Sequence, residues 1–167
     1  FTSGVLGRYA LHFHMGDDAT RGSKVVGAVV REAGGHAFVP HASHGIEFTS
    51  CISHDTFDDA YWWDGMPDNR TPAPETNDTV YRSCVASLVR SDPPFRGYRL
   101  AGFALGAGSG NAAFDCAAVG VQGNGDAAGF VWPEMLNSGV WTFQRCVTHN
   151  NKINGIFTWQ NTGRNHV

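Results

Sequence analysis

Apolar and polar residues alternate in short runs along the chain, and turn-forming residues separate these runs. The segment "ALHFHMG" at residues 10–16 is typical, because Leu11 and Phe13 alternate there with His12 and His14. A two-residue period places alternate side chains on opposite faces of a strand. No segment keeps the spacing of an amphipathic helix over the length of a helix. The pattern therefore predicts an all-β chain of many short strands.

The alternating runs recur as an internal repeat that is marked by cysteines. Cys51, Cys84, Cys116 and Cys146 are separated by 33, 32 and 30 residues, and an aromatic residue stands shortly before each of them. An earlier copy has Ala28 in the cysteine position. Repeats that contain only short strands and turns predict a right-handed parallel β-helix of about five to six coils, with equivalent residues stacked in columns.

The repeat extends over most of the chain, so we interpret residues 1–167 as a single β-helix domain. Its longest insertion is the loop at residues 64–77, which is rich in Pro, Asn and Asp. No capping segment is recognisable, and we interpret the chain as a fragment or as an uncapped solenoid. Uncapped ends expose strand edges, which predicts a homo-oligomer formed through them.

The four cysteines are compatible with disulfides or with zinc, but their spacing favours neither. The sequence has no C-x-x-C pair, and a linear column of thiols does not form a tetrahedron. We therefore expect small apolar side chains that fill an interior column. Neighbouring rungs lie within disulfide reach, so one oxidised pair remains an alternative.

Aligning the strands that follow the polar turns predicts which side chains face the core. One column is large and apolar, and we expect it to face inward: Leu11, Phe38, Tyr61, Phe130, Ile156. The alternate columns then face outward. The first of these contains His12, Val39, Trp62, Val131 and Phe157, and the second contains His14, His41, Asp64, Pro133 and Trp159.

The second outward column predicts a site. It brings His14, His41 and Asp64 onto three adjacent rungs, and His12 stands two residues from His14 as a fourth ligand. Imidazoles and a carboxylate at this spacing suit a divalent metal ion. They also suit acid/base catalysis by Asp64 and His41. The alternative is a solvated ladder in which Asp64 only begins a turn.

Three further residues are expected to bind substrate around this column. Trp62 and Trp159 flank it, where an indole ring stacks on a sugar, and His44 would orient a partner from outside. The loop at residues 64–77 is expected to overhang this surface. The remaining histidines of the repeat are interpreted as turn or ladder residues: His36, His54 and His149.

Composition removes two classes of partner. The formal charge is −3, and charged residues make up 16% of the chain without a basic cluster, which argues against nucleic-acid binding. No apolar run reaches about 18 residues, so the sequence predicts no membrane span.

The stretches "GRYALHFHMGDD", "VPHASHGIEF" and "SHDTFDDAYWWDG" resemble the parallel β-helix region of the cell-surface hyaluronidase family. Members of this family carry a G8 domain and are called cell-migration-inducing hyaluronan-binding proteins. The resemblance covers residues 7–65. It implies polysaccharide binding or cleavage at His12, His14, His41 and Asp64, and a secreted or extracellular location.

The resulting hypothesis is a β-helix that binds or cleaves a polysaccharide. If the chain is an enzyme, we expect a glycoside hydrolase or a polysaccharide lyase, with a divalent metal that polarises substrate or water. Two alternatives stay open, since fold does not determine function. They are a non-catalytic carbohydrate-binding module and a purely structural or self-assembling β-helix.

Overall fold

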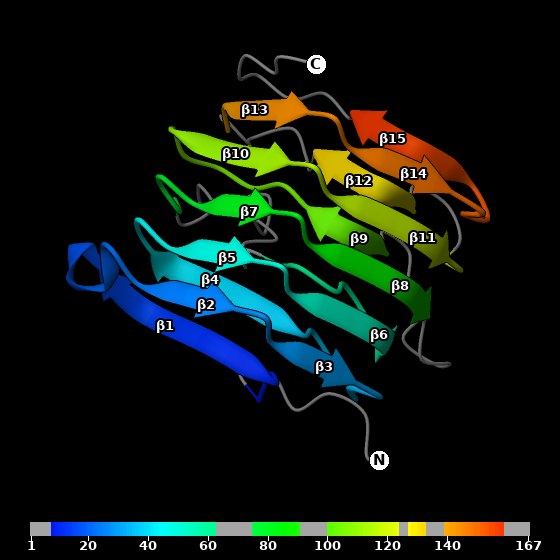
Figure 1. Cartoon of the computed structure of the whole chain (residues 1–167), viewed down its shortest axis with the longest axis horizontal. Helices are drawn as coiled ribbons and strands as arrows, with labels where there is room; N and C mark the ends of the chain where they lie inside the picture. Colours follow the sequence, from blue (N-terminus) through cyan, green and yellow to red (C-terminus); the bar gives the residue numbers. More distant parts are fainter. Residues whose placement is uncertain (1–7, 63–74, 91–99, 124–126, 133–138, 159–167) are drawn as a thin grey trace, which may run out of the picture.

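Each strand pairs in parallel with the strand one repeat away, so the chain winds into a β-solenoid (Figure 1). This computed structural model describes residues 8–62, 75–90, 100–123, 127–132 and 139–158. The all-β parallel β-helix predicted from the repeat is confirmed. The solenoid has about four turns, slightly fewer than the five to six coils predicted.

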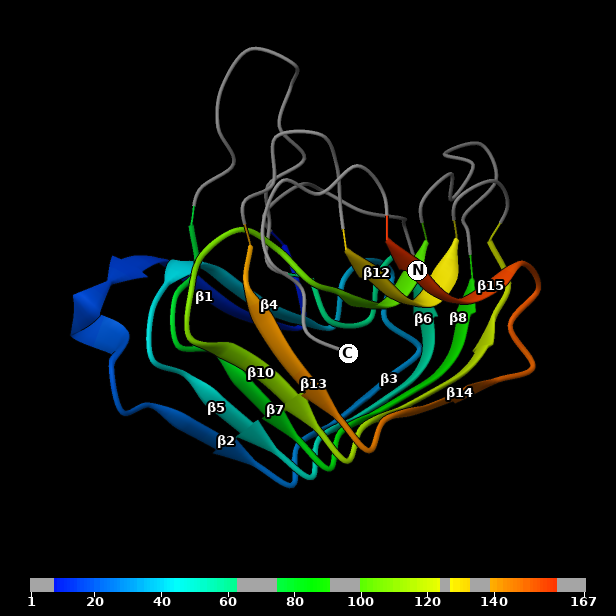
Figure 2. The ribbon, with the colours of Figure 1, turned by 90° about the horizontal axis from the view of Figure 1, so that it is seen from above.

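Three sheets run along the solenoid and form the sides of a three-sided cross-section (Figure 2). Sheet I contains β2 Lys24–Val26, β5 Glu47–Thr49, β7 Val80–Arg82, β10 Asn111–Phe114 and β13 Trp141–Gln144. Sheet II contains β3 Val29–Arg31, β6 Ile52–Phe57, β8 Val85–Arg90, β11 Ala117–Val121 and β14 Val147–His149.

Sheet III is built from β1 Leu11–Asp17, β4 Phe38–Ser43, β9 Ala101–Ala104, β12 Ala128–Trp132 and β15 Asn154–Thr158. Tyr61 bridges β4 to β9 through single parallel bridges to Phe38 and Phe103, so the two parts of the sheet form one surface. A 3-10 turn at Asp18–Thr20 follows β1. Within the described ranges, no helix is long and apolar enough to cross a membrane.

One residue in the left-handed conformation turns the chain from sheet I to sheet II in every repeat. The residues with this positive φ are Gly27, Ser50, Ser83, Asp115 and Arg145. Since a single such residue redirects the backbone without adding length, the hydrogen bonds between rungs continue through the corner. The amide of Ser50, for example, donates to the carbonyl of Arg82 at 2.9 Å.

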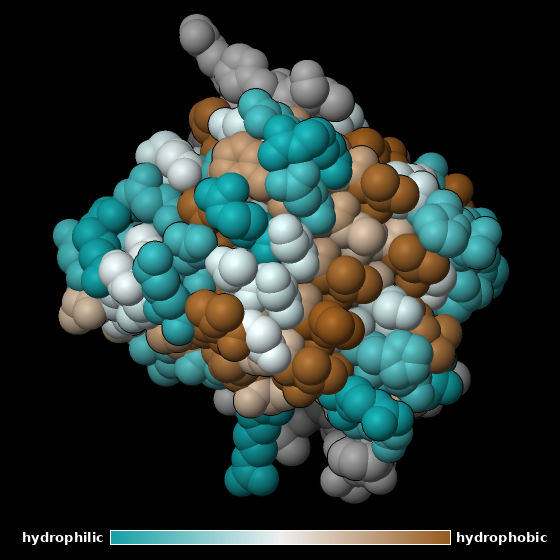
Figure 3. Space-filling view, in the orientation of Figure 1, coloured by the Kyte–Doolittle hydropathy of each residue, from teal (hydrophilic) through white to brown (hydrophobic). Residues whose placement is uncertain are grey.

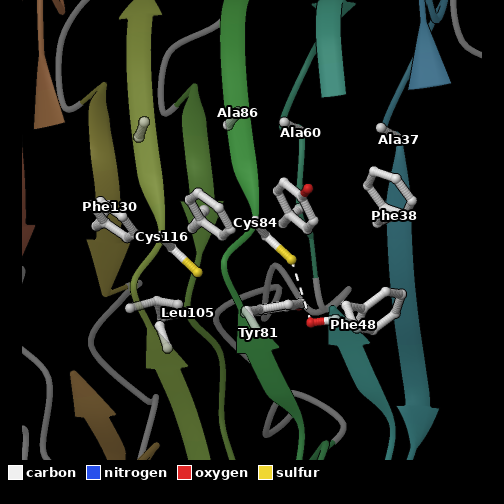
Figure 4. Packing of buried hydrophobic residues seen from close by; sticks show 14 of the residues in the cluster. Ala37, Phe38, Phe48, Ala60, Tyr81, Cys84, Ala86, Leu105, Cys116 and Phe130 are labelled. Carbon is white, nitrogen blue, oxygen red and sulfur yellow. Dashed lines mark hydrogen bonds between the residues drawn. The ribbon is translucent and has the colours of Figure 1, made fainter. Parts of the chain in front are cut away.

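The cysteines follow this corner and point into the solenoid, as predicted. Cys51, Cys84 and Cys116 are buried, Cys146 is partly exposed, and all four are free thiols. The Cys84 thiol donates to the carbonyl of Phe48 at 3.3 Å (Figure 4). Burial raises the pKa of Cys51, because an apolar surrounding disfavours the thiolate.

Stacked aromatic rings fill the core beneath sheet III (Figure 4). The ring of Tyr61 lies 4.8 Å from that of Phe38 and 4.3 Å from that of Phe103, and Phe103 lies 4.9 Å from Phe130. The predicted inward column is therefore confirmed from Leu11 to Phe130, whereas Ile156 on the last strand is 41% exposed, and one rung is added. The column predicted from the sequence lacks Phe103, whose ring lies between those of Tyr61 and Phe130.

A column of small residues precedes these rings and sets how closely sheets II and III approach. It includes Ala37, Ala60, Gly102 and Gly129. A Cβ atom on Gly102 would lie 2.7 Å from the carbonyl oxygen of Gly129 and 2.8 Å from the Cβ of Ala118. Contacts this short have no room for a methyl group, so the narrow corner requires glycine there.

Columns also form on the outer surface. Figure 3 shows apolar side chains gathered on the face that sheets I and II present. Val29 and Val147 are 59% and 57% exposed and belong to one register column of sheet II. Its members are Val29, Ile52, Val85, Ala117 and Val147.

Candidate functional site

His14 and His41 face each other on adjacent rungs of sheet III. The pairing of β1 with β4 puts the two residues in direct register. Their Nδ1 atoms are 3.1 Å apart, so the N–H of one ring donates a hydrogen bond to the ring nitrogen of the other. The prediction that residues far apart in sequence share one outward column is confirmed for this pair.

His12 completes a cluster of three imidazoles. Its ring centroid lies 5.0 Å from that of His14 and 6.0 Å from that of His41. The ring planes of His12 and His41 are only 6° from parallel. One ring nitrogen of each histidine lies within 4.8 Å of the other two. His14 is exposed, whereas His12 and His41 are half-buried. We call these three residues the imidazole cluster.

The strand pattern explains why the imidazole cluster forms. Leu11 and Phe13 point to the opposite face of β1 and pack on the core, where the ring of Phe13 meets that of Phe48 at 6.2 Å. Since successive side chains of a strand point to opposite faces, this apolar anchoring turns His12 and His14 outward together.

A polar contact ends the paired segment directly after the cluster. The register shifts beyond His14, and the amide of Gly16 donates to the Ser43 hydroxyl at 3.0 Å. That hydroxyl donates in turn to the carbonyl of His41 at 2.9 Å. The buried Ser43 thus ties together the backbone of both strands that carry the cluster.

Two of the predicted site residues lie outside the described residues. Asp64 was predicted as a catalytic residue and metal ligand, and Trp159 was predicted to bind substrate. Most of the predicted loop at residues 64–77 is also outside them, with only residues 75–77 described. These three assignments stay predictions.

The expectation that Trp62 is exposed is wrong. Its side chain is 7% exposed and stacks on the ring of His36, with the centroids 3.9 Å apart and the planes 19° from parallel. The outward face of sheet III is apolar around Trp62, where the indole packs in a buried apolar group together with Val39 and Val131. Trp62 is therefore a packing residue of this face rather than an open platform for a sugar.

His44 has a structural contact that the sequence did not predict. Its Nδ1 atom accepts the backbone N–H of Asn77 at 3.1 Å, so the neutral ring carries its proton on Nε2. The Thr20 hydroxyl donates to the His44 carbonyl at 2.9 Å. His44 thus fixes the start of the segment that leads into β7, and its role toward substrate stays a prediction.

His54 and His149 lie on sheet II, away from the imidazole cluster. The Nδ1 atom of His54 is 3.3 Å from the Ser87 hydroxyl of the next rung, and His149 is exposed in register with Val119. Both are ladder residues, as predicted.

His36 was interpreted as a turn or ladder residue, but it is 7% exposed and belongs to a second cluster. One ligand atom each of His36, Asp58 and Asp59 lies within 4.8 Å of the others. Tyr9 stands between the two clusters, with its ring 4.9 Å from that of His12 and 5.0 Å from that of His36. Sequence alignment contained one signal for this arrangement, because His36 and Asp59 both directly precede the small-residue column.

Asp59 is an unusual carboxyl group for this surface. It is 8% exposed, and burial together with the negative charge of Asp58 raises its pKa well above the ordinary aspartate value. The amide of Ala101 donates to one of its oxygens at 2.6 Å, which acts in the opposite direction. Desolvation is the larger effect, so the fold favours the protonated acid.

No family model, curated protein or solved structure matches this chain. The resemblance to the hyaluronidase family therefore stays an expectation from three short stretches.

The imidazole cluster has the composition of a transition-metal site. Neutral imidazole suits Zn²⁺, Cu²⁺ and Ni²⁺, and three histidine ligands leave one position open for water or substrate. Bonds of about 2.0–2.1 Å in a tetrahedron place two ligand nitrogens about 3.3 Å apart. The 3.1 Å between His14 and His41 is close to that separation. The ligand atom of His12 lies within 4.8 Å of those of His14 and His41 and supplies the third position of the set.

Proposed function

We propose that this chain is a polysaccharide-acting β-solenoid module in which His12, His14 and His41 bind a divalent transition-metal ion on sheet III. The observation that carries the proposal is the imidazole cluster itself, in which three ligand atoms from two adjacent rungs lie within 4.8 Å of one another. The solenoid repeats and the resemblance in "GRYALHFHMGDD" support a polysaccharide as the substrate class.

The metal would act on a sugar in one of two ways. As a Lewis acid it polarises a carboxylate or hydroxyl oxygen of the substrate, and with bound water it supplies a nucleophile near neutral pH. The first role suits elimination by a lyase and the second suits hydrolysis. His41 serves here as a metal ligand, and the acid/base role predicted for Asp64 is retained as part of the proposal.

The metal is tested by titrating Zn²⁺ into metal-free protein in a calorimeter and comparing His14→Ala with His149→Ala. We expect one site, a loss of at least tenfold in affinity for His14→Ala, and no change for His149→Ala. Both replaced imidazoles are exposed, so neither variant disturbs the core. Equal affinity in all three proteins contradicts the metal site.

The substrate class is tested separately, with hyaluronan and pectin-type polymers incubated with zinc-loaded protein. New reducing ends indicate cleavage, and an accompanying ultraviolet absorbance of an unsaturated product indicates elimination rather than hydrolysis. Binding without cleavage favours the non-catalytic module. Metal binding without either contradicts the polysaccharide part of the proposal and favours a structural solenoid.

A further inference from the structure

The second cluster, His36 with Asp58 and Asp59, lies on the other side of Tyr9 from the imidazole cluster. His36 comes directly before the small-residue column of one rung, and Asp59 occupies the same place on the next. The bridge between Phe38 and Tyr61 sets this register. Asp58 precedes Asp59 with a positive φ of 73°, and its Oδ1 atom accepts the backbone N–H of Asp59 at 3.1 Å.

The position of the proton on His36 is fixed by a backbone contact. Its Nδ1 atom lies 3.2 Å from the carbonyl oxygen of Asp59, which can only accept, so Nδ1 donates. The neutral ring therefore presents the lone pair of Nε2 on its other side. A histidine that donates its remaining N–H to a backbone carbonyl has the orientation found in metal ligands.

Packing holds that orientation. The His36 ring is stacked on Trp62 at 3.9 Å and lies against Tyr9 at 5.0 Å, with only 7% of the residue exposed. A ring enclosed in this way does not rotate freely, so Nε2 keeps its direction without a bound ligand. Preorganisation of this kind lowers the entropic cost of binding an ion.

His36 Nε2 faces the carboxylate of Asp58. The distance from Nε2 to the Asp58 Oδ2 atom is 3.8 Å, beyond the range of about 2.7–3.2 Å for such a bond. Two adjacent carboxyl groups share this space with one imidazole, and without an ion the fold favours the protonated acid at Asp59. A divalent ion between the three groups would displace that proton and offset the negative charge of both carboxylates.

We propose that His36 Nε2 and the carboxylates of Asp58 and Asp59 form a second divalent-cation site, which accepts Mn²⁺. Two oxygen ligands and one imidazole suit this harder ion, whereas three imidazoles favour zinc, copper or nickel. The exposed side chain of Asp58 gives the ion a path from solvent, while Asp59 and His36 are buried. The inference uses no residue of the imidazole cluster and does not depend on the proposed function.

The test titrates Mn²⁺ into the His14→Ala protein, which lacks a complete imidazole cluster, and measures free Mn²⁺ by electron paramagnetic resonance. We expect one bound equivalent. Adding Asp58→Asn should weaken binding at least tenfold, and Asp59→Asn should do the same. Glu32→Gln removes a similarly accessible carboxylate directly after β3 and should change nothing. Unchanged affinity in the Asp58→Asn protein overturns the proposal.

A second measurement on the unsubstituted site locates the ion directly and needs no variant of this cluster. In an amide NMR spectrum, Mn²⁺ should broaden the signal of Ala101 beyond detection, because its N–H is hydrogen-bonded to Asp59. The amide of Ala113, in sheet I, should remain visible. Broadening that leaves Ala101 sharp shows that the ion binds elsewhere and contradicts the site.

Discussion

The inward and outward faces of sheet III differ in how regularly their side chains repeat, although the same strands form both faces. Inward, one aromatic ring follows another from Phe38 to Phe130, because every turn must fill the same cross-section. Outward, the side chains change from the exposed imidazole of His14 to the buried indole of Trp62 within two rungs. Repetition thus constrains the interior, and the chemistry lies where outward columns depart from repetition.

The largest loss of stability should come from removing a ring from the inward aromatic column. Phe103→Ala removes a fully buried ring that stacks on Tyr61 at 4.3 Å and on Phe130 at 4.9 Å. The lost burial and the cavity left between two stacked rings should lower the free energy of unfolding by about 3–5 kcal/mol. Urea denaturation followed by circular dichroism measures it.

The matched control for this substitution is on an outward column. Val29 is 59% exposed, and Val29→Ala should change the stability by less than about 0.5 kcal/mol. A comparable loss in the two variants would mean that the outward apolar column stabilises the solenoid as much as the aromatic stack does.

The two faces also differ in how far the sequence predicted them. The repeat and the two-residue period predicted the sheets, the cysteine column and the register of His14 with His41. The burial of Trp62 was not predictable, because it depends on what packs over an outward face, and the alternation of a single strand contains no such information. The sequence predicted that the side chain faces outward and wrongly equated outward with exposed.

The second cluster was missed for a different reason. His36 and Asp59 sit at the corner before sheet III, where the two-residue alternation does not hold. Ala37 and Phe38 follow each other and are both in the core, so counting by twos from the strand gives the wrong face for the preceding residue. The pattern that relates the two residues is the small-residue column, because His36 directly precedes Ala37 and Asp59 directly precedes Ala60.

A smaller effect, dependent on metal, should follow from changing the outward face. Without metal, His14→Ala should leave the unfolding free energy within about 0.5 kcal/mol of the original, because the side chain is exposed. With Zn²⁺ at about 100 times its dissociation constant, the unsubstituted protein should gain about 2.7 kcal/mol and the variant much less. The gain should shrink in acid, where protons compete for the ring nitrogens.

Thermal unfolding with and without Zn²⁺ measures this difference, and a chelator should reverse it. A destabilisation of His14→Ala that is equal in the presence and absence of metal would assign the histidine to packing. It would then belong with the inward residues in its effect, despite its exposure.

The smallest change in stability should come from removing the ion pair of Asp115 and Arg145, at the corner between sheets I and II. Arg145 donates to both oxygens of Asp115, at 2.6 and 2.9 Å, and these hydrogen bonds lower the pKa of the carboxyl group. Asn is tolerated well at positive φ, so Asp115→Asn removes the charge while keeping the left-handed corner at φ 56°. Both side chains are largely accessible to water, which screens their attraction.

The sign of the pH dependence follows from the direction of that shift. A lowered pKa means that the folded state prefers the ionised carboxylate, so the stabilisation is present above the ordinary value of 3.8 and is lost as the pH falls through the lowered pKa. The unsubstituted protein should therefore show a slightly higher urea midpoint than Asp115→Asn at pH 7 in low salt. The difference should vanish in about 1 M salt, because screening acts on exposed charges. A difference in urea midpoint that grows in acid, or that survives high salt, would show that packing at the Asp115 corner contributes to stability. The division between a constrained interior and a weakly coupled exterior would then fail at Asp115, directly beside the buried Cys116.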